Sequence, residues 1–187
     1  SDGRARAFVA FEIPAAQRAG LEAEFRELRR ELPPSRWTRP EGWHLTLKFL
    51  GEVEHSTLAS LAGALRQRLE GHPAPSARLG GSGFFPSPAN PRVAWVGGAV
   101  VGVGPVIEAL EEAAEAVGFA RERRAWSVHL TVARLKGRWP RSAVERFLAW
   151  GGELELEPFA CTEVVLFESA LVPGGAVYTA LERMPLS

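Results

Sequence analysis

Two short segments of the chain share residue types that could carry out acid–base chemistry. HLTLKFLGEV at 44–53 and HLTVARLKGR at 129–138 both begin with His-Leu-Thr and lie nearly half a chain length apart. Random placement of the four histidines and six threonines predicts about 0.13 His-x-Thr pairs, a composition prior, yet three occur. The matched pair therefore indicates a duplicated functional element.

The other two histidines have simpler interpretations. His55, in the third match His-Ser-Thr, directly precedes a helical pattern and lies outside any strand pattern. Ser56 or Thr57 suits a helix N-cap there, and we expect His55 at the surface. His72 is followed by Pro-Ala-Pro and is expected in a loop.

Each repeat has the pattern of a β-strand, whose alternate side chains point to opposite faces. His44, Thr46 and Lys48 share one face of the first strand, and His129 and Thr131 share one face of the second. The opposite faces carry leucine, valine and phenylalanine side chains that suit a core. Two such strands facing each other across a cleft would gather two imidazoles and two hydroxyls around one small volume.

Opening a cyclic phosphodiester requires this set of groups. A neutral imidazole takes a proton from the attacking water, and a protonated imidazole gives one to the leaving ribose oxygen. The hydroxyls of Thr46 and Thr131 can donate hydrogen bonds to the non-bridging phosphate oxygens. Two histidines without a nearby Cys, Asp or third His make a poor zinc ligand set, so we expect neither a metal nor a cofactor.

Two further basic residues are candidates for phosphate binding. Arg134 completes the pattern H-x-T-x-x-R. Simple alternation places it on the face opposite His129, so it contacts phosphate only at a strand end or past a bulge and is otherwise structural. By alternation, Lys48 lies on the same face of the strand as His44. It could add positive charge to the site, or it could be a solvated lysine at a sheet edge.

Several aromatic residues lie near the motifs. Trp37, Trp43, Phe84 and Phe85 could stack on a terminal base. Aromatic residues belong more often to the core, and we expect a core position for most of these four. The carboxylates that follow the first motif, Glu52 and Glu54, are expected in solvent.

Strand and helix patterns alternate along the chain. The predicted strands are 6–13, 43–50, 76–85, 92–98, 126–134, 163–169 and 176–182, and the predicted helices are 15–32, 57–70, 105–117 and 140–150. PSPANP at 86–91 is interpreted as a loop because it holds three prolines. Short turns between strand pairs favour an α+β fold with antiparallel sheets over a doubly wound parallel sheet. We expect a single domain over 1–187 with two similar halves, about 1–98 and 99–187.

Composition narrows the classes of partner. The 22 basic and 22 acidic residues balance, which argues against tight nonspecific binding of long nucleic acid and requires a local patch for any polyanion. Twenty of the basic residues are arginine, whose planar fork suits phosphate. The single cysteine, Cys161, excludes an internal disulfide framework and a cysteine-based structural zinc site. The sequence shows neither an apolar run long enough to span a bilayer nor a signal peptide pattern, so we expect a cytoplasmic protein without membrane contact. We also expect a monomer, although no sequence feature indicates the oligomeric state.

With these motifs the chain resembles the two-histidine phosphoesterases, which carry one H-x-T-x motif in each of two pseudo-symmetric lobes. Within them it is most similar to the bacterial and archaeal RNA 2′,3′-cyclic phosphodiesterases, historically called 2′-5′ RNA ligases. The similarity covers nearly the whole chain. It includes RAFVAFEIP, HLTLKFLGEV, GFFPSPANPRVAWVG, HLTVARL and VVLFESALVPGGAVYTALERMPL.

The resemblance implies two α+β lobes, each an antiparallel sheet backed by helices, with a cleft between them. It also implies that His44 is the proton donor, that His129 is the proton acceptor, and that Thr46 and Thr131 contact phosphate. The substrate is then an RNA end with a 2′,3′-cyclic phosphate, and the product carries a 2′-phosphate because the 3′ oxygen leaves.

Two alternative functions remain open. The same residues could catalyse the reverse reaction, ligation through a 2′-5′ linkage. A module that binds RNA ends without turnover is the other alternative, although two intact motifs weigh against it.

Overall fold

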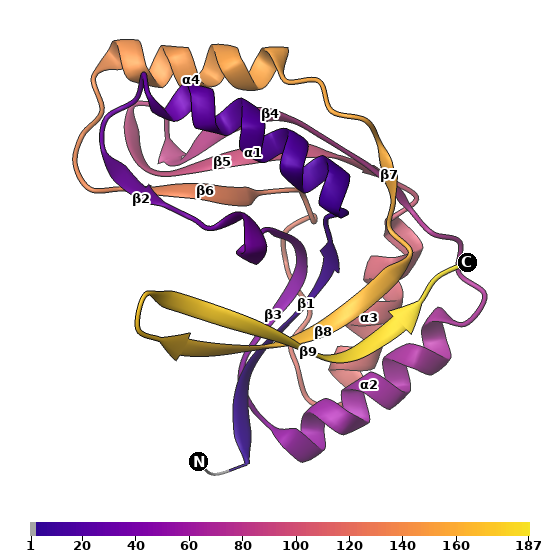
Figure 1. The fold of residues 1–187 in the computed structure, drawn as a ribbon. Helices are drawn as coiled ribbons and strands as arrows, with labels where there is room; N and C mark the ends of the chain where they lie inside the picture. Colours follow the sequence, from indigo (N-terminus) through magenta and orange to yellow (C-terminus); the bar gives the residue numbers. More distant parts are fainter. Residues whose placement is uncertain (1–2) are drawn as a thin grey trace.

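The computed structural model describes residues 3–187, which form two antiparallel sheets with helices on their outer faces (Figure 1). The helices are α1 (Ala15–Arg29), α2 (His55–Leu69), α3 (Gly104–Ala116) and α4 (Arg141–Glu153), with a short 3-10 helix, η1 (Pro40–Gly42). The strands are β1 (Arg4–Glu12), β2 (Ser35–Trp37), β3 (His44–Glu54), β4 (Ser76–Ser87), β5 (Asn90–Val101), β6 (Leu130–Leu135), β7 (Phe159–Ala160), β8 (Glu163–Val172) and β9 (Gly175–Pro185). The predicted α+β class with antiparallel sheets is confirmed.

The strands are ordered β3-β1-β8-β9 in one sheet and β2-β6-β5-β4-β7 in the other. Helices α2 and α3 cover the outer face of the four-stranded sheet, while α1 and α4 cover the outer face of the five-stranded sheet (Figure 1). The first motif therefore lies at the edge of one sheet, on β3, and the second lies at the start of β6 in the other.

The predicted division into halves at residues 98 and 99 does not separate the two sheets. The four-stranded sheet joins β1 and β3 to β8 and β9 from the far end of the chain. The boundary would also cut through β5, which spans Asn90–Val101. The sheets do not follow the two halves because β1, near the start of the chain, pairs with β8, near its end. Each sheet therefore contains strands from both halves.

Other differences lie in short or proline-containing segments. The loop predicted over 86–91 is a turn, as expected, but a shorter one: β4 extends to Ser87 and β5 begins at Asn90, leaving two residues between them. The strand predicted over 126–134 begins only at Leu130, so His129 lies one residue before β6. Strands β2 and β7 and helix η1 were not predicted, because two or three residues are too few to show a periodic pattern.

The core that supports the motifs lies between each sheet and its helices. Phe25 of α1, for example, is buried against the indoles of Trp37 and Trp150. A second, smaller cluster lies on the other face of the four-stranded sheet, and its buried members are Phe8, Ala10, Val165 and Phe167. No helix within residues 3–187 is both long and apolar enough to cross a membrane.

Candidate active site

His44 and Thr46 lie on the inner face of the four-stranded sheet, the face turned away from α2 and α3. Thr46 pairs with Ala10 across β1, and Ala10 belongs to the small inner cluster. The His44 ring lies 4.5 Å from the Phe167 ring and 5.5 Å from the Tyr178 ring. Aromatic side chains from β8 and β9 therefore form the surroundings of the first imidazole.

His129 and Thr131 lie on the inner face of the five-stranded sheet in the same way. Thr131 pairs with Trp95 of β5. The His129 ring lies 4.7 Å from the Trp95 ring and 4.8 Å from the Phe85 ring, both edge to face. Gly83 permits this position of the indole, because a Cβ there would lie 2.2 Å from Trp95.

Each motif strand carries a β-bulge directly after its threonine. On β3 the partners step from Thr46–Ala10 to Lys48–Val9, which leaves Leu47 as the extra residue. On β6 the partners step from Thr131–Trp95 to Ala133–Ala94, which leaves Val132 as the extra residue. An extra residue reverses the alternation of side chains beyond it. The two residues after each extra residue, Lys48 and Phe49 on β3 and Ala133 and Arg134 on β6, therefore take the opposite face from the one that simple alternation predicts.

The bulge on β3 makes the predicted phosphate-binding position of Lys48 wrong. Lys48 pairs with Val9, which is fully buried in the main core, so its side chain points to the helical side. Its Nζ lies 2.8 Å from Glu111 Oε1 on α3 and donates to the carbonyl of Ala120 at 2.9 Å. Only 2% of the Lys48 side chain is exposed. Its role is an internal ion pair.

The bulge on β6 brings Arg134 to the face that carries Thr131. Arg134 pairs with Val93, two residues from Trp95 on β5, and cross-strand partners share a face. The guanidinium is exposed there. Arg134 thus meets the condition set from the sequence, a position past a bulge.

Hydrogen bonds from two indoles join the motifs to each other. Trp126 Nε1 donates to the carbonyl of Thr46 at 2.8 Å. Trp43 Nε1 donates to Thr38 Oγ1 at 2.8 Å, and this hydroxyl donates to the carbonyl of Thr131, also at 2.8 Å. The residue before the first motif is therefore linked to the second motif, and the segment before the second motif is linked to the first.

The environment of His44 lowers its pKa below the ordinary imidazole value, and burial is the main cause. The Gly42 carbonyl and the Glu12 carboxylate act in the opposite direction, and the Arg18 charge lowers the pKa further. Nδ1 lies 3.0 Å from the Gly42 carbonyl. Because a carbonyl only accepts, Nδ1 carries a hydrogen and Nε2 is the nitrogen left for a substrate.

Burial also lowers the pKa of His129, although this residue is more exposed than His44. Its Nδ1 lies 3.3 Å from the hydroxyl of Ser127. Both imidazoles therefore favour the neutral form more than a histidine fully surrounded by water does.

The other two histidines and the two glutamates lie where the sequence predicts, whereas the helix N-cap does not. His55 is exposed at the first position of α2, and His72 lies in the loop after that helix, as expected. The predicted N-cap is wrong, since Glu54 takes the cap position without a side-chain hydrogen bond. Glu52 and Glu54 are exposed as expected.

Of the four aromatic candidates, only Phe85 contacts a motif histidine. Trp43 and Phe84 are buried in the core, and Trp37 is packed against it. The expectation of a core position for most of them is confirmed.

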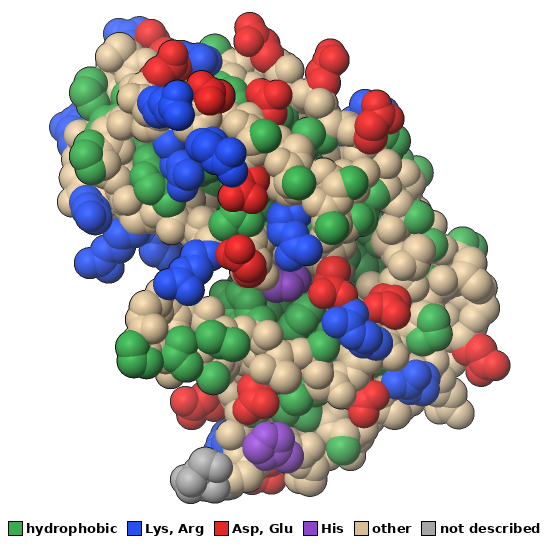
Figure 2. All heavy atoms as spheres, viewed as in Figure 1, with side chains coloured by type: hydrophobic (Ala, Val, Ile, Leu, Met, Phe, Trp, Pro, Cys, Tyr) green, Lys and Arg blue, Asp and Glu red, His purple; other side chains and the backbone are tan. Residues whose placement is uncertain are grey.

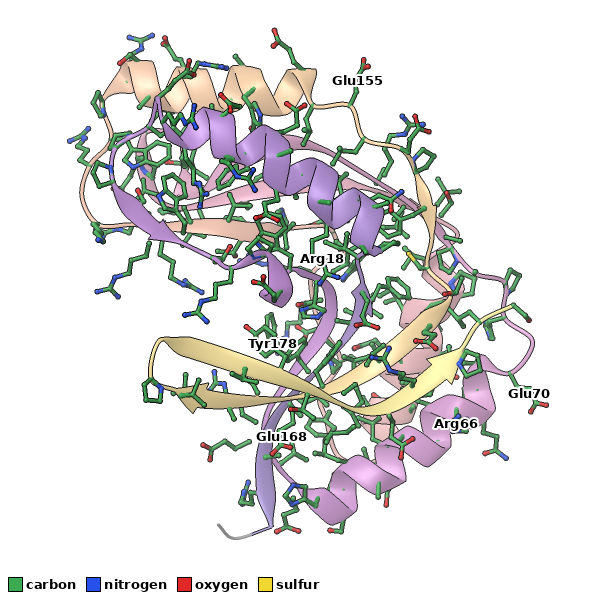
Figure 3. All side chains as sticks on the ribbon, viewed as in Figure 1. Arg18, Arg66, Glu70, Glu155, Glu168 and Tyr178 are labelled. Atoms are coloured by element: carbon green, nitrogen blue, oxygen red, sulfur yellow. The ribbon has the colours of Figure 1, made fainter. Side chains whose placement is uncertain are left out.

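Sequence reasoning missed several residues of the inner faces. Trp95, Phe167 and Tyr178 surround the imidazoles, yet they come from strands distant in sequence, so no local pattern indicates them. Phe49, three residues after Thr46, corresponds to Arg134, three residues after Thr131. It is 74% exposed and lies opposite Phe8 only because of the bulge. Arg18 and Tyr178 are labelled in Figure 3 on the two sides of the gap between α1 and the β8–β9 hairpin.

Within residues 3–187, no group of three or more His, Cys, Asp or Glu side chains is arranged to hold a metal ion. A surface cavity of about 670 Å³ lies between α2 and the C-terminal segment, lined by Arg66, Glu70 and Met184 among others. It contains neither motif histidine and is separate from the site.

Comparison with known proteins identifies the family and the fold. The family model for LigT-like phosphoesterases matches residues 11–95. The RNA 2′,3′-cyclic phosphodiesterase of Thermus thermophilus is 35% identical, with 97% of this chain and 90% of the relative covered. The crystal structure of TT0787 from the same organism superposes with a TM-score of 0.76 at 31% identity, covering 97% of both chains. Escherichia coli LigT in complex with 3′-AMP gives a TM-score of 0.72 at 25% identity, covering 98% of this chain and 99% of LigT. The chain belongs to the LigT-like phosphoesterases.

Proposed function

We propose that this protein hydrolyses RNA ends that carry a 2′,3′-cyclic phosphate and releases 2′-phosphomonoesters. The observation that carries the proposal is the placement of two His/Thr pairs on the inner faces of two sheets, with the motifs linked by the indoles of Trp43 and Trp126. Relatives covering nearly the whole chain are named RNA 2′,3′-cyclic phosphodiesterases.

In the proposed reaction, His129 and His44 divide the proton transfers. The oxygen of a water molecule attacks phosphorus while neutral His129 accepts a proton from that water. The bond from phosphorus to the 3′ oxygen breaks, and protonated His44 gives its Nε2 proton to that oxygen. The contact between Nδ1 of His44 and the Gly42 carbonyl keeps Nε2 directed at the leaving group. The product is a 2′-phosphate, and no covalent intermediate forms.

Three side chains would stabilise the charge on the phosphate in this reaction. Thr46 and Thr131 lie on the same faces as their histidines and can donate hydrogen bonds to the non-bridging oxygens. Arg134 adds a positive charge on the face of Thr131, where a guanidinium can bind phosphate through two N–H groups.

The deciding experiment is turnover of adenosine 2′,3′-cyclic phosphate, with phosphorus NMR to identify the product. We expect a 2′-phosphate and turnover that persists in EDTA. A predominantly 3′-phosphate product would reverse the proposed orientation, and loss of turnover in EDTA with recovery on adding one metal would overturn the metal-free mechanism. Binding without turnover would instead favour the RNA-end binding module.

Ligation uses the same groups in reverse, with a 5′-hydroxyl in place of water. Product analysis with an excess of 5′-hydroxyl RNA separates it from hydrolysis, because only ligation makes a 2′-5′ linkage. The proposal includes a cytoplasmic location and a monomer, which fractionation and light scattering would test.

A further inference from the structure

We propose that Arg36, beside Arg134, forms a second phosphate-binding site for the phosphodiester that precedes the terminal nucleotide. The preferred substrate is then a single-stranded RNA end rather than a free cyclic mononucleotide. This inference rests on the proposed function and extends the same site along the RNA strand.

Arg36 lies on the inner face of the five-stranded sheet, as its neighbours show. The next residue, Trp37, points to the helical side, where its ring lies 5.3 Å from the Phe25 ring of α1. Neighbouring residues of a strand point to opposite faces, so Arg36 leaves β2 on the inner face. Its direct partner across the strands is Arg134, which lies on the same face as Thr131 because of the bulge.

Arg36 and Arg134 place two like charges side by side. Adjacent strands are about 5 Å apart, and like charges directly opposite each other destabilise a sheet. Arg36 and Arg134 are both exposed, and the part of the chain that the structure describes offers neither of them a carboxylate partner. An RNA end that places its reacting phosphate at Arg134 and its preceding phosphodiester at Arg36 would remove this repulsion, because each guanidinium would donate paired N–H groups to its own phosphate.

The β8–β9 hairpin lies on the other side of the site. Leu171 and Tyr178 share the hairpin face that carries Phe167, and they are 88% and 37% exposed. The turn of the hairpin lies close to the chain that leaves β2, because Arg39 donates a hydrogen bond of 3.0 Å to the carbonyl of Gly174. Figure 2 shows Lys and Arg side chains gathered along the margin above a hollow and hydrophobic side chains on the hairpin below it.

The two sides of this hollow suit the two parts of a nucleotide chain. Single-stranded nucleic acids bind where basic side chains follow the phosphates and apolar or aromatic side chains receive the bases. Tyr178 of the hairpin also lies 5.5 Å from the His44 ring, so the hollow is continuous with the catalytic histidine. Paired bases of a duplex could not contact the hairpin in this way.

The test compares two substrates, adenosine 2′,3′-cyclic phosphate and the dinucleotide ApA ending in a 2′,3′-cyclic phosphate. We expect Arg36→Ala to lower kcat/KM for the dinucleotide by about 10–100-fold, as for loss of a hydrogen bond to a charged group. The loss should lie in KM, and kcat/KM for the mononucleotide should change by less than about twofold.

Arg141→Ala is the matched control. Arg141 is exposed on α4, which covers the outer face of the five-stranded sheet, away from the inner face that carries Arg36. We expect this variant to match the wild type on both substrates. Thermal unfolding of Arg36→Ala should show no loss of stability, because the substitution removes a like-charge pair.

An equal loss of kcat/KM on both substrates, or no loss on either, would overturn the second phosphate site. Turnover of the mononucleotide by the wild type would still support the proposed function. If the wild type hydrolyses neither substrate, the proposed function fails. Fluorescein-labelled ApA with a 2′-phosphate end is then titrated, and an unchanged Kd for Arg36→Ala would overturn the second phosphate site as well.

Discussion

The indole of Trp126 donates a 2.8 Å hydrogen bond to the backbone carbonyl of Thr46. This bond joins the segment that leads into His129 directly to the first motif, across the boundary between the two sheets. Because His129 lies just before β6 rather than within it, sheet pairing does not hold its backbone. We therefore expect the indole to act as a positioning group for the second imidazole.

Trp126→Phe should lower kcat by about 10-fold or more, since small displacements of a catalytic group are costly, with a smaller change in KM. The free energy of unfolding should fall by about 1 kcal/mol for the lost hydrogen bond. Steady-state kinetics and urea unfolding measure the two effects. Trp150→Phe is the control, because Trp150 Nε1 is buried without a hydrogen-bond partner among the described residues; if both variants lose kcat equally, Trp126 has no positioning role.

His44→Ala and His129→Ala should each reduce hydrolysis by roughly 10²–10⁴-fold, the usual contribution of a positioned acid or base. Thr46→Ala and Thr131→Ala should cost less, about 10–10²-fold. Single-turnover rates with a cyclic nucleotide test all four.

His55→Ala provides the control for the three His-x-Thr matches. It is exposed at the start of α2, and its replacement should leave the rate unchanged. Equal damage from His55→Ala and His44→Ala would contradict the assignment of the motifs.

The pH dependence of kcat/KM should be bell-shaped, with its optimum below the ordinary imidazole pKa of about 6.5. The proposed reaction needs His129 neutral and His44 protonated, so we expect activity to fall in acid as His129 gains a proton and in alkali as His44 loses one. Burial lowers both pKa values, which moves both limbs toward acid. A bound phosphate stabilises protonated His44, so the profile of kcat should lie to the alkaline side of that of kcat/KM. An optimum above about pH 8 for kcat/KM, well beyond the ordinary imidazole range, would contradict these environments.

Lys48→Ala should destabilise the fold by about 3–5 kcal/mol, because it leaves the buried carboxylate of Glu111 without its partner. The double replacement Lys48→Met with Glu111→Leu removes both charges and should recover most of that loss. Urea unfolding measures both variants. A variant of Lys48 that keeps full stability but raises KM would restore the phosphate-binding role that the structure contradicts.

The sequence by itself determined the two motifs and the face that each His shares with its Thr. Those residues are two apart on one strand, and alternation over such a short distance is a local property of the backbone. It also determined the antiparallel α+β class, since the helix and strand patterns repeat with short turns. The surface position of His55 followed from the helical pattern that it precedes, whereas the core position of Trp43 was expected only from the general tendency of aromatic residues to be buried.

Only the tertiary structure decided what lies beyond each threonine. The bulges at Leu47 and Val132 exist because β3 pairs with β1 and β6 pairs with β5 in particular registers, and pairing between residues distant in sequence leaves no periodic signal. These two extra residues turn Lys48 into the core and Arg134 toward the site. The aromatic surroundings of His44 and His129, and the position of Arg36 opposite Arg134, depend on the same long-range pairing, because side chains from different strands meet only when the sheets have formed.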